Sequence, residues 1–172
     1  MMKKMYVTMT LTVLLLIAGA CSKDVTNDNS SGGDQILNKG NYTFLKSTAI
    51  YNDAKENRSE DYSAPFEITK VEKIDNTLNI TVSFLKGCKV SKFDVIWNGI
   101  ILQTYPQIIG LIVKRTADNC VTSEDTETQV LSIDLIECIG DTSLVNDASI
   151  IVSNASKKPD TSNADITISN KN

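Results

Sequence analysis

The stretch Leu78-Asn79-Ile80-Thr81-Val82-Ser83-Phe84 decides the fold class of this chain, because large apolar and polar side chains alternate strictly along it. Successive side chains of a β-strand point to opposite faces, so the pattern predicts a strand with one buried face and one wet face. Residues 66–74 form another apolar-rich run, and Asp75-Asn76 between the two runs is typical of a turn. We therefore expect a β-hairpin over residues 66–84.

The next expected strand carries Phe93, Val95 and Trp97 at every second position and stops at Asn98-Gly99. Both residues of an Asn-Gly pair accept positive φ, and between apolar runs this dipeptide is the strongest short signal for a hairpin. Residues 100–102 are then expected to return as the partner strand.

Residues 108–113 are apolar on both faces and predict a central strand, with Gly110 as a candidate bulge. A polar loop is expected over residues 114–128. Further strands are expected at 130–136, 148–152 and 165–169, and a first one at 42–50. No segment combines a period of 3.6 residues with helix caps. The chain therefore reads as all-β: a single β-sandwich, immunoglobulin-like or related, of about 7–8 strands.

The amino-terminal segment predicts the cellular localisation of the protein. Lys3 and Lys4 precede a short apolar run, and small residues lead to Cys21, an arrangement that resembles a bacterial lipoprotein signal. The run is shorter than the roughly 20 residues needed to span a bilayer. A short transmembrane anchor and an ordinary secretory signal are the alternatives. Ser22, in place of aspartate after the cysteine, favours the outer membrane by the same resemblance.

These features divide the chain into a signal peptide (1–20), a flexible tether from the lipidated Cys21 (21–41) and a β-sandwich domain (42–172) with a loose carboxyl-terminal tail. The expected localisation is the outer membrane, on the periplasmic or the cell-surface side. The net charge of −4 becomes more negative when Lys3 and Lys4 are removed. An acidic surface repels phosphate backbones, so no nucleic-acid partner is expected.

Three cysteines remain in the mature domain: Cys88, Cys120 and Cys138. An oxidising compartment favours one disulfide. Cys88 and Cys120 both occupy loop-like points, which makes them the first choice and leaves Cys138 as a buried thiol. Cys120 with Cys138 is the competing pair. The cysteines lack the spacing of a zinc site, so no metal or cofactor is expected.

The chain contains no histidine. This excludes catalysis by Ser-His-Asp or Cys-His groups and argues against most transition-metal sites. A pair of carboxylates acting in glycoside hydrolysis stays open as an alternative. The acidic residues Glu124, Asp125 and Glu127 lack the pattern of a calcium loop and are interpreted as a solvated loop.

Trp97 and Tyr105 are the candidate ligand-binding residues, because flat aromatic faces can stack on sugar rings. Trp97 is in phase with Phe93 and Val95, which favours a place in the core. Tyr105 precedes Pro106 and is the better candidate for an exposed aromatic.

The middle of the chain resembles a family of uncharacterised small lipoproteins of the Bacteroidetes. The resemblance rests on Gly87-Cys88, Phe93, Trp97-Asn98-Gly99, Tyr105-Pro106, Leu111, Asp118-Asn119-Cys120 and Ile133-Asp134-Leu135. It covers about residues 66–137 and implies no particular activity. It supports pairing of Cys88 with Cys120. Family members often carry a histidine where this chain has Ser91, so a role that needs that imidazole would be absent here.

Together these features predict a lipid-anchored, non-catalytic binding or interaction module of the cell envelope. Its partners would be the membrane, through the lipid anchor, and a protein or glycan. The alternatives are a glycan-binding accessory of a polysaccharide uptake system and a small envelope hydrolase that uses carboxylates.

Overall fold

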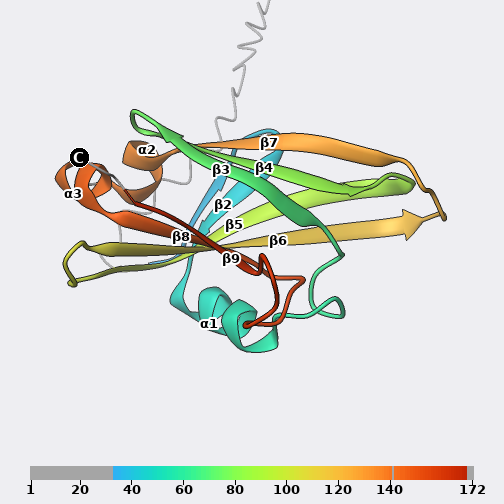
Figure 1. Ribbon diagram of the computed structural model, residues 1–172, viewed down its shortest axis with the longest axis horizontal. Coiled ribbons are helices and arrows are strands. Elements are labelled where there is room, and N and C mark those ends of the chain that lie inside the picture. Colours follow the sequence, from blue (N-terminus) through green and yellow to red (C-terminus); the bar gives the residue numbers. More distant parts are fainter. Residues whose placement is uncertain (1–32, 141, 170–172) are drawn as a thin grey trace, which may run out of the picture.

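The computed structural model describes residues 33–140 and 142–169. The proposed signal peptide and Cys21 lie outside these residues. The chain is mostly β, with 54% strand and 15% helix, and its strands form one sheet of six and one of three. Figure 1 shows the three-stranded sheet above the six-stranded one, with α1 beneath the larger sheet. The prediction of an all-β sandwich is confirmed.

The larger sheet has the strand order β1-β2-β5-β6-β8-β9, and the smaller sheet has the order β3-β4-β7. The strands of the larger sheet are β1 (Gln35–Asn38), β2 (Tyr42–Lys46), β5 (Cys88–Leu102), β6 (Ile108–Cys120), β8 (Ser149–Asn154) and β9 (Asp165–Ile168). Those of the smaller sheet are β3 (Glu67–Ile74), β4 (Thr77–Leu85) and β7 (Thr126–Asp134). The helices are α1 (Thr48–Asn57), α2 (Leu135–Ile139) and α3 (Thr142–Asp147).

The core lies between the two sheets and follows the predicted alternation. Leu78, Ile80 and Val82 of β4 are fully buried, and Phe84 is 6% exposed. They pack against the inward-facing side chains of β5 and β6, of which Phe93 meets the ring of Phe84 with 5.4 Å between the ring centroids. The predicted hairpin is formed by β3 and β4, and its turn places Asp75 at φ 51°.

The tether was predicted to extend to residue 41, and this is wrong for residues 35–38. These residues form β1, which pairs antiparallel with β2 and raises the strand number above the predicted 7–8 to nine in the described part of the chain. A strand this short carries too few side chains to show a period of two, so its formation depends on the neighbouring strand.

Asn98-Gly99 does not end a hairpin, so that prediction is wrong. Residues 98–100 stand opposite Gly110 alone, because Trp97 pairs with Leu111 and Ile101 with Ile109. The dipeptide is a bulge within β5: Gly99 has φ +78°, and Asn98 Oδ1 accepts from the Ile100 amide at 2.9 Å. Positive φ suits a bulge as well as a turn, so the same residues serve either.

The loop predicted over residues 114–128 is mostly strand. β6 continues to Cys120, and only residues 121–125 connect it to β7. The polar composition has a physical cause: beyond Arg115 the strand is largely exposed, so it needs no apolar face. The predicted bulge at Gly110 lies on the partner strand β5 instead.

The sequence predicted no helix, and α1 corrects this. Ser47 caps α1 by accepting from the Ile50 amide, and the fully buried Ala54 packs with Ile96 and Ile112 on the outer face of the larger sheet. One narrow apolar contact is enough to dock a short helix but gives little periodic signal. Asp134 likewise caps α2, so the strand predicted to end at residue 136 ends at Asp134. Within the described residues, none of the helices is long and apolar enough to cross a membrane.

Candidate functional site

The disulfide joins Cys88 and Cys120, as predicted. The two residues lie directly opposite each other, at the first residue of β5 and the last residue of β6. The bond therefore holds together the end of the longest antiparallel pair in the larger sheet, the end on the right in Figure 1.

Cys138 is free, as the favoured pairing implied, and lies on α2 with 2% of its surface exposed. Burial raises the pKa of its thiol to about 12. A thiol that stays protonated is a poor nucleophile, so Cys138 is a packing residue and not a reactive group.

The two predicted ligand-binding aromatics do not form a stacking platform. Trp97 is only 3% exposed, and its Nε1 donates to the carbonyl of Ile100 at 3.2 Å, so its ring belongs to the core. Tyr105 is fully exposed in the connection between β5 and β6. The predicted role of Trp97 in stacking is therefore wrong, and its alternative place in the core is confirmed. One exposed tyrosine alone does not make a sugar platform.

The candidate site is a cleft of about 440 Å³ at the disulfide end, with walls from both sheets. Its volume lies within the range of small-molecule sites. The cleft is lined by Phe84, Leu85, Lys86, Gly87, Cys88, Ser91, Arg115, Glu127 and Gln129.

Arg115 is the deepest charged group in the cleft and is 4% exposed. Its Nε donates to Ser91 Oγ at 3.0 Å and its Nη1 to the Pro65 carbonyl at 3.0 Å. Its Nη2 has the disulfide sulfur of Cys88 at 3.7 Å, a weak acceptor. These contacts fix the plane of the guanidinium between β5, β6 and the segment that precedes β3.

No carboxylate within the described residues forms an ion pair with Arg115. Burial lowers the pKa of the Arg115 guanidinium, and the negative charge of Glu127 acts in the opposite direction. Arginine nevertheless stays charged at any physiological pH. The cleft thus holds a buried positive charge that Glu127 stabilises from a distance but that pairs directly with no carboxylate of the described residues.

A second hollow of about 280 Å³ continues from the cleft toward β2. The two share Ser91 and Gln129. Asn41 and Tyr42 line the second hollow, and their side chains donate to the Val130 and Ser132 carbonyls at the outer edge of β7. The polar groups of both hollows therefore follow the open side of the sandwich between β5 and β7.

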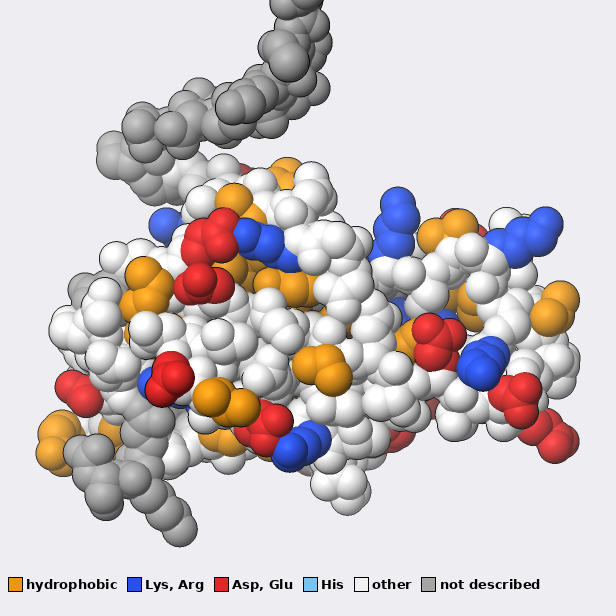
Figure 2. Space-filling model, turned by 90° about the horizontal axis from the view of Figure 1, so that it is seen from above, with side chains coloured by type: hydrophobic (Ala, Val, Ile, Leu, Met, Phe, Trp, Pro, Cys, Tyr) orange, Lys and Arg blue, Asp and Glu red, His pale blue; other side chains and the backbone are white. Residues whose placement is uncertain are grey.

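The surface around the smaller sheet carries no large patch of one kind. Figure 2 shows acidic and basic side chains interspersed on this face, with small, separate apolar areas, and several charges of both signs at the disulfide end. A broad docking face is therefore a weaker candidate on this side than the cleft.

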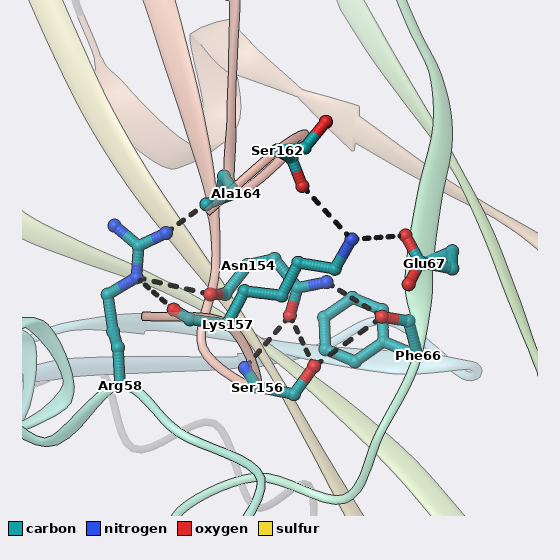
Figure 3. Close-up of polar contacts among 8 residues, drawn as sticks. All are labelled: Arg58, Phe66, Glu67, Asn154, Ser156, Lys157, Ser162 and Ala164. Carbon is teal, nitrogen blue, oxygen red and sulfur yellow. Dashed lines mark hydrogen bonds and ion pairs between the residues drawn. The ribbon is translucent and has the colours of Figure 1, made fainter. Parts of the chain in front are cut away.

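The other buried arginine, Arg58, has a different environment (Figure 3). Its Nε donates to the carbonyls of Asn154 and Lys157, and its Nη2 donates to that of Ala164 at 2.8 Å. Its Nη1 lies 2.9 Å from the Asp165 carboxylate. Arg58 is thus neutralised and fastens the end of α1 to the connection between β8 and β9, which is a structural role.

The sequence interpretation missed Arg115 because it placed residues 114–128 in a loop. A signal was present: Arg115 continues the inward-facing series of Leu111 and Val113 along β6. A charge in the inward phase of an otherwise apolar strand is a rare and informative position. Ser91 lies in the same cleft.

The acidic residues Glu124 and Asp125 are exposed in the short connection before β7, whereas Glu127 belongs to β7 and lines the cleft. In the part of the chain that the structure describes, no three His, Cys, Asp or Glu side chains are grouped to hold a metal ion.

No protein-family model matches the chain, and neither the curated proteins nor the solved structures compared with it give a match. What the protein binds must therefore be inferred from its own geometry.

Proposed function

We propose that this protein is a lipid-anchored binding module of the cell envelope, without catalytic activity, whose ligand occupies the cleft around Arg115. The observation that carries the proposal is a buried guanidinium that forms no ion pair with any described residue and lies on the wall of an open cleft. Proteins rarely bury a charge without a partner, because the loss of hydration must be compensated. A bound ligand would supply the missing partner.

The rigidity of the cleft supports a binding role. Its walls come from β4, β5, β6 and β7, and the disulfide holds β5 and β6 in register beside it. A preformed site loses little conformational entropy when it binds a ligand. The absence of histidine from the sequence supports binding over general acid–base catalysis, in which histidine is the residue most often used.

Anchoring rests on the amino-terminal sequence. Acylation of Cys21 would hold the domain at the outer membrane, since two acyl chains give stable attachment where one gives only marginal binding. Radiolabelled palmitate should enter the wild-type protein and not the Cys21→Ala variant. Equal labelling of the two proteins would reject the anchor.

The cleft is tested by photo-crosslinking in intact cells. A photoreactive amino acid replaces Gln129 in the cleft or, as a control, the fully exposed Tyr105 outside the cleft. We expect a defined mass adduct on the protein substituted at position 129 and none on the control. No adduct at position 129, or the same adducts at both positions, would contradict a ligand site in the cleft.

A further inference from the structure

We infer that the ligand of the Arg115 cleft is a small carboxylic acid that also carries a hydrogen-bond donor, such as a hydroxy acid or a sugar acid. The inference rests on the proposed function and specifies the chemistry of its ligand. It follows from the unused donors of Arg115, from Lys86 at the cleft, and from Glu127 on the facing sheet.

The first step concerns the donors of Arg115. A guanidinium has five N–H groups. Its contacts with Ser91, Pro65 and Cys88 use one N–H on each of the three nitrogens, and the contact with Cys88 is to sulfur at 3.7 Å. Among the described residues, the remaining two N–H groups have no acceptor. The residue is 4% exposed and lines the cleft, so a ligand in the cleft can reach these groups.

The second step concerns the kind of acceptor. The planar fork of a guanidinium matches the two oxygens of a carboxylate, and charge-assisted bonds of this type are roughly twice as strong as neutral ones. Phe84 covers one face of the guanidinium, with its ring centroid 4.3 Å from Cζ. The N–H groups of a guanidinium lie in its plane, so the ring leaves them open to a carboxylate that approaches edge-on.

Lys86 adds a second positive charge. It lies in the connection between β4 and β5, and its backbone amide donates to the Asp125 carbonyl at 2.8 Å. Within the described residues its ammonium forms no ion pair. Gly87 follows with φ +103°, and a side chain there would meet the Val121 carbonyl, so the backbone that presents Lys86 is closely fixed.

Glu127 is the reason for expecting a hydrogen-bond donor on the ligand. It stands opposite Phe84 across β4 and β7 and lines the same cleft. Its carboxylate accepts hydrogen bonds and repels a second anion, so it selects a hydroxyl or amino group at that end. Two cations beside one carboxylate leave the cleft positive in an otherwise acidic protein. A simple inorganic anion would satisfy Arg115 but not Glu127.

The test is a titration of the purified domain, followed by two-dimensional NMR of the backbone amides and of Arg115 Nε–H. The probes are lactate and glucuronate, with lactamide and glucose as their neutral counterparts and sulfate as an anion without a hydrogen-bond donor. We expect saturable shifts at Gly87, Ser91 and Arg115 with the two acids and none with the neutral counterparts. No saturable shift with either acid, equal shifts with their neutral counterparts, or binding of sulfate alone would overturn the inference.

Three variants separate binding from folding. Lys86→Gln, at an exposed position, should weaken the two acids about tenfold, the usual effect of losing one charge-assisted bond. The matched control Lys70→Gln, at an exposed lysine on β3, should leave affinity unchanged. Arg115→Lys keeps the charge but loses the planar pair of N–H donors. It should weaken the binding of the two acids at least as much as Lys86→Gln does. Equal affinities of Lys86→Gln, Lys70→Gln and wild type would contradict the assignment.

Glu127→Gln gives a readout that a purely structural role of the cleft would not produce. Removing the repelling carboxylate should strengthen the binding of sulfate relative to lactate. An unchanged ratio would contradict the role of Glu127. If the acids fail while crosslinking at position 129 yields a neutral adduct, the inference on ligand class is wrong and the binding role stands. If both experiments are negative, both are wrong.

Discussion

The guanidinium carbon of Arg115 lies 4.3 Å from the centroid of the Phe84 ring, so the one charge buried beside the cleft rests on the last inward-facing side chain of β4. The same ring packs against Phe93 on β5. Phe84 therefore joins the end of the core to the charged group of the cleft, and the fold and the site depend on each other here.

Phe84→Leu should lower the free energy of unfolding by about 1–2 kcal/mol, since it retains an apolar side chain but loses the cation–π contact and the aromatic packing. Urea denaturation followed by circular dichroism measures this change. The neighbouring exposed Leu85→Ala is the control and should change stability by less than about 0.5 kcal/mol. Equal effects of the two substitutions would mean that the Phe84 ring does not support Arg115.

The disulfide should contribute about 3–4 kcal/mol to stability, because Cys88 and Cys120 are separated by 32 positions and closing a loop of that size restricts the unfolded chain. The Cys88→Ser/Cys120→Ser variant and the reduced wild type should show similar losses in urea denaturation. A reductant should leave the stability of the double variant unchanged. A further loss on adding reductant to this variant would indicate that another sulfur pair had formed.

Arg58→Ala should lower stability by about 3 kcal/mol or more, because it removes the side-chain donors to the Asn154, Lys157 and Ala164 carbonyls and leaves Asp165 without its counter-ion. The exposed ion pair of Lys70 with Glu72 provides the comparison, and Lys70→Ala should change stability by less than about 1 kcal/mol. Differential scanning calorimetry of the two variants compares them. A similar small change in both would show that the network in Figure 3 is dispensable.

Gly110→Ala tests how α1 packs on the larger sheet. A methyl group on Gly110 would lie 2.6 Å from Tyr51 Oη, which is too close, so the variant should lose about 1–3 kcal/mol. Tyr51→Phe removes that oxygen and should recover part of the loss in a double-mutant cycle. Strictly additive effects would place Tyr51 away from Gly110.

Alkaline pH should weaken the fold in part through Cys138. Burial raises the pKa of this thiol in the folded protein to about 12 from its ordinary value of 9.0, so between these pH values the folded state keeps a proton that the unfolded state has lost. The contribution of this thiol to the free energy of unfolding is therefore fully present below about pH 9. It is lost as the pH rises between the two pKa values, by up to about 1 kcal/mol per pH unit. Burial also raises the pKa of Tyr42, which adds to the same decline.

Denaturation of wild type and Cys138→Ala at a series of alkaline pH values separates these contributions. The variant should be less stable near neutral pH, because it leaves a small cavity, but its stability should decline less steeply above pH 9. If the stability of the two proteins declined equally steeply with pH, the Cys138 thiol would be exposed to water in the folded protein.

The sequence predicted those parts of the fold in which a single face is buried. The alternation from Leu78 to Phe84 identified β4, because burial of every second residue leaves a direct trace in the pattern. The hairpin predicted at Asn98-Gly99 is wrong because a glycine with positive φ suits a bulge as well as a turn. Helix α1 was missed because Ala54 is its buried residue, and one buried residue leaves no helical period in the sequence. Strand β1 was missed because its formation depends on pairing with β2 and not on its own sequence.

The site was less predictable than the fold. Cys88 and Cys120 could be paired by choosing among three cysteines, but Arg115, Lys86 and Glu127 come from different strands and connections. Their meeting depends on the register of β5 with β6 and of β4 with β7, which no local pattern specifies. The inward phase of Arg115 was visible in the sequence, and its lack of a counter-ion was not.

The central claim is that a ligand neutralises Arg115 in the cleft, and native mass spectrometry of the protein purified from the cells that produce it tests it most directly. The wild type and Lys70→Gln should carry a dissociable adduct of one mass, and Arg115→Gln, confirmed as folded by circular dichroism, should lack it. A wild-type protein without any adduct, or an Arg115→Gln variant that retains the adduct, would contradict the claim.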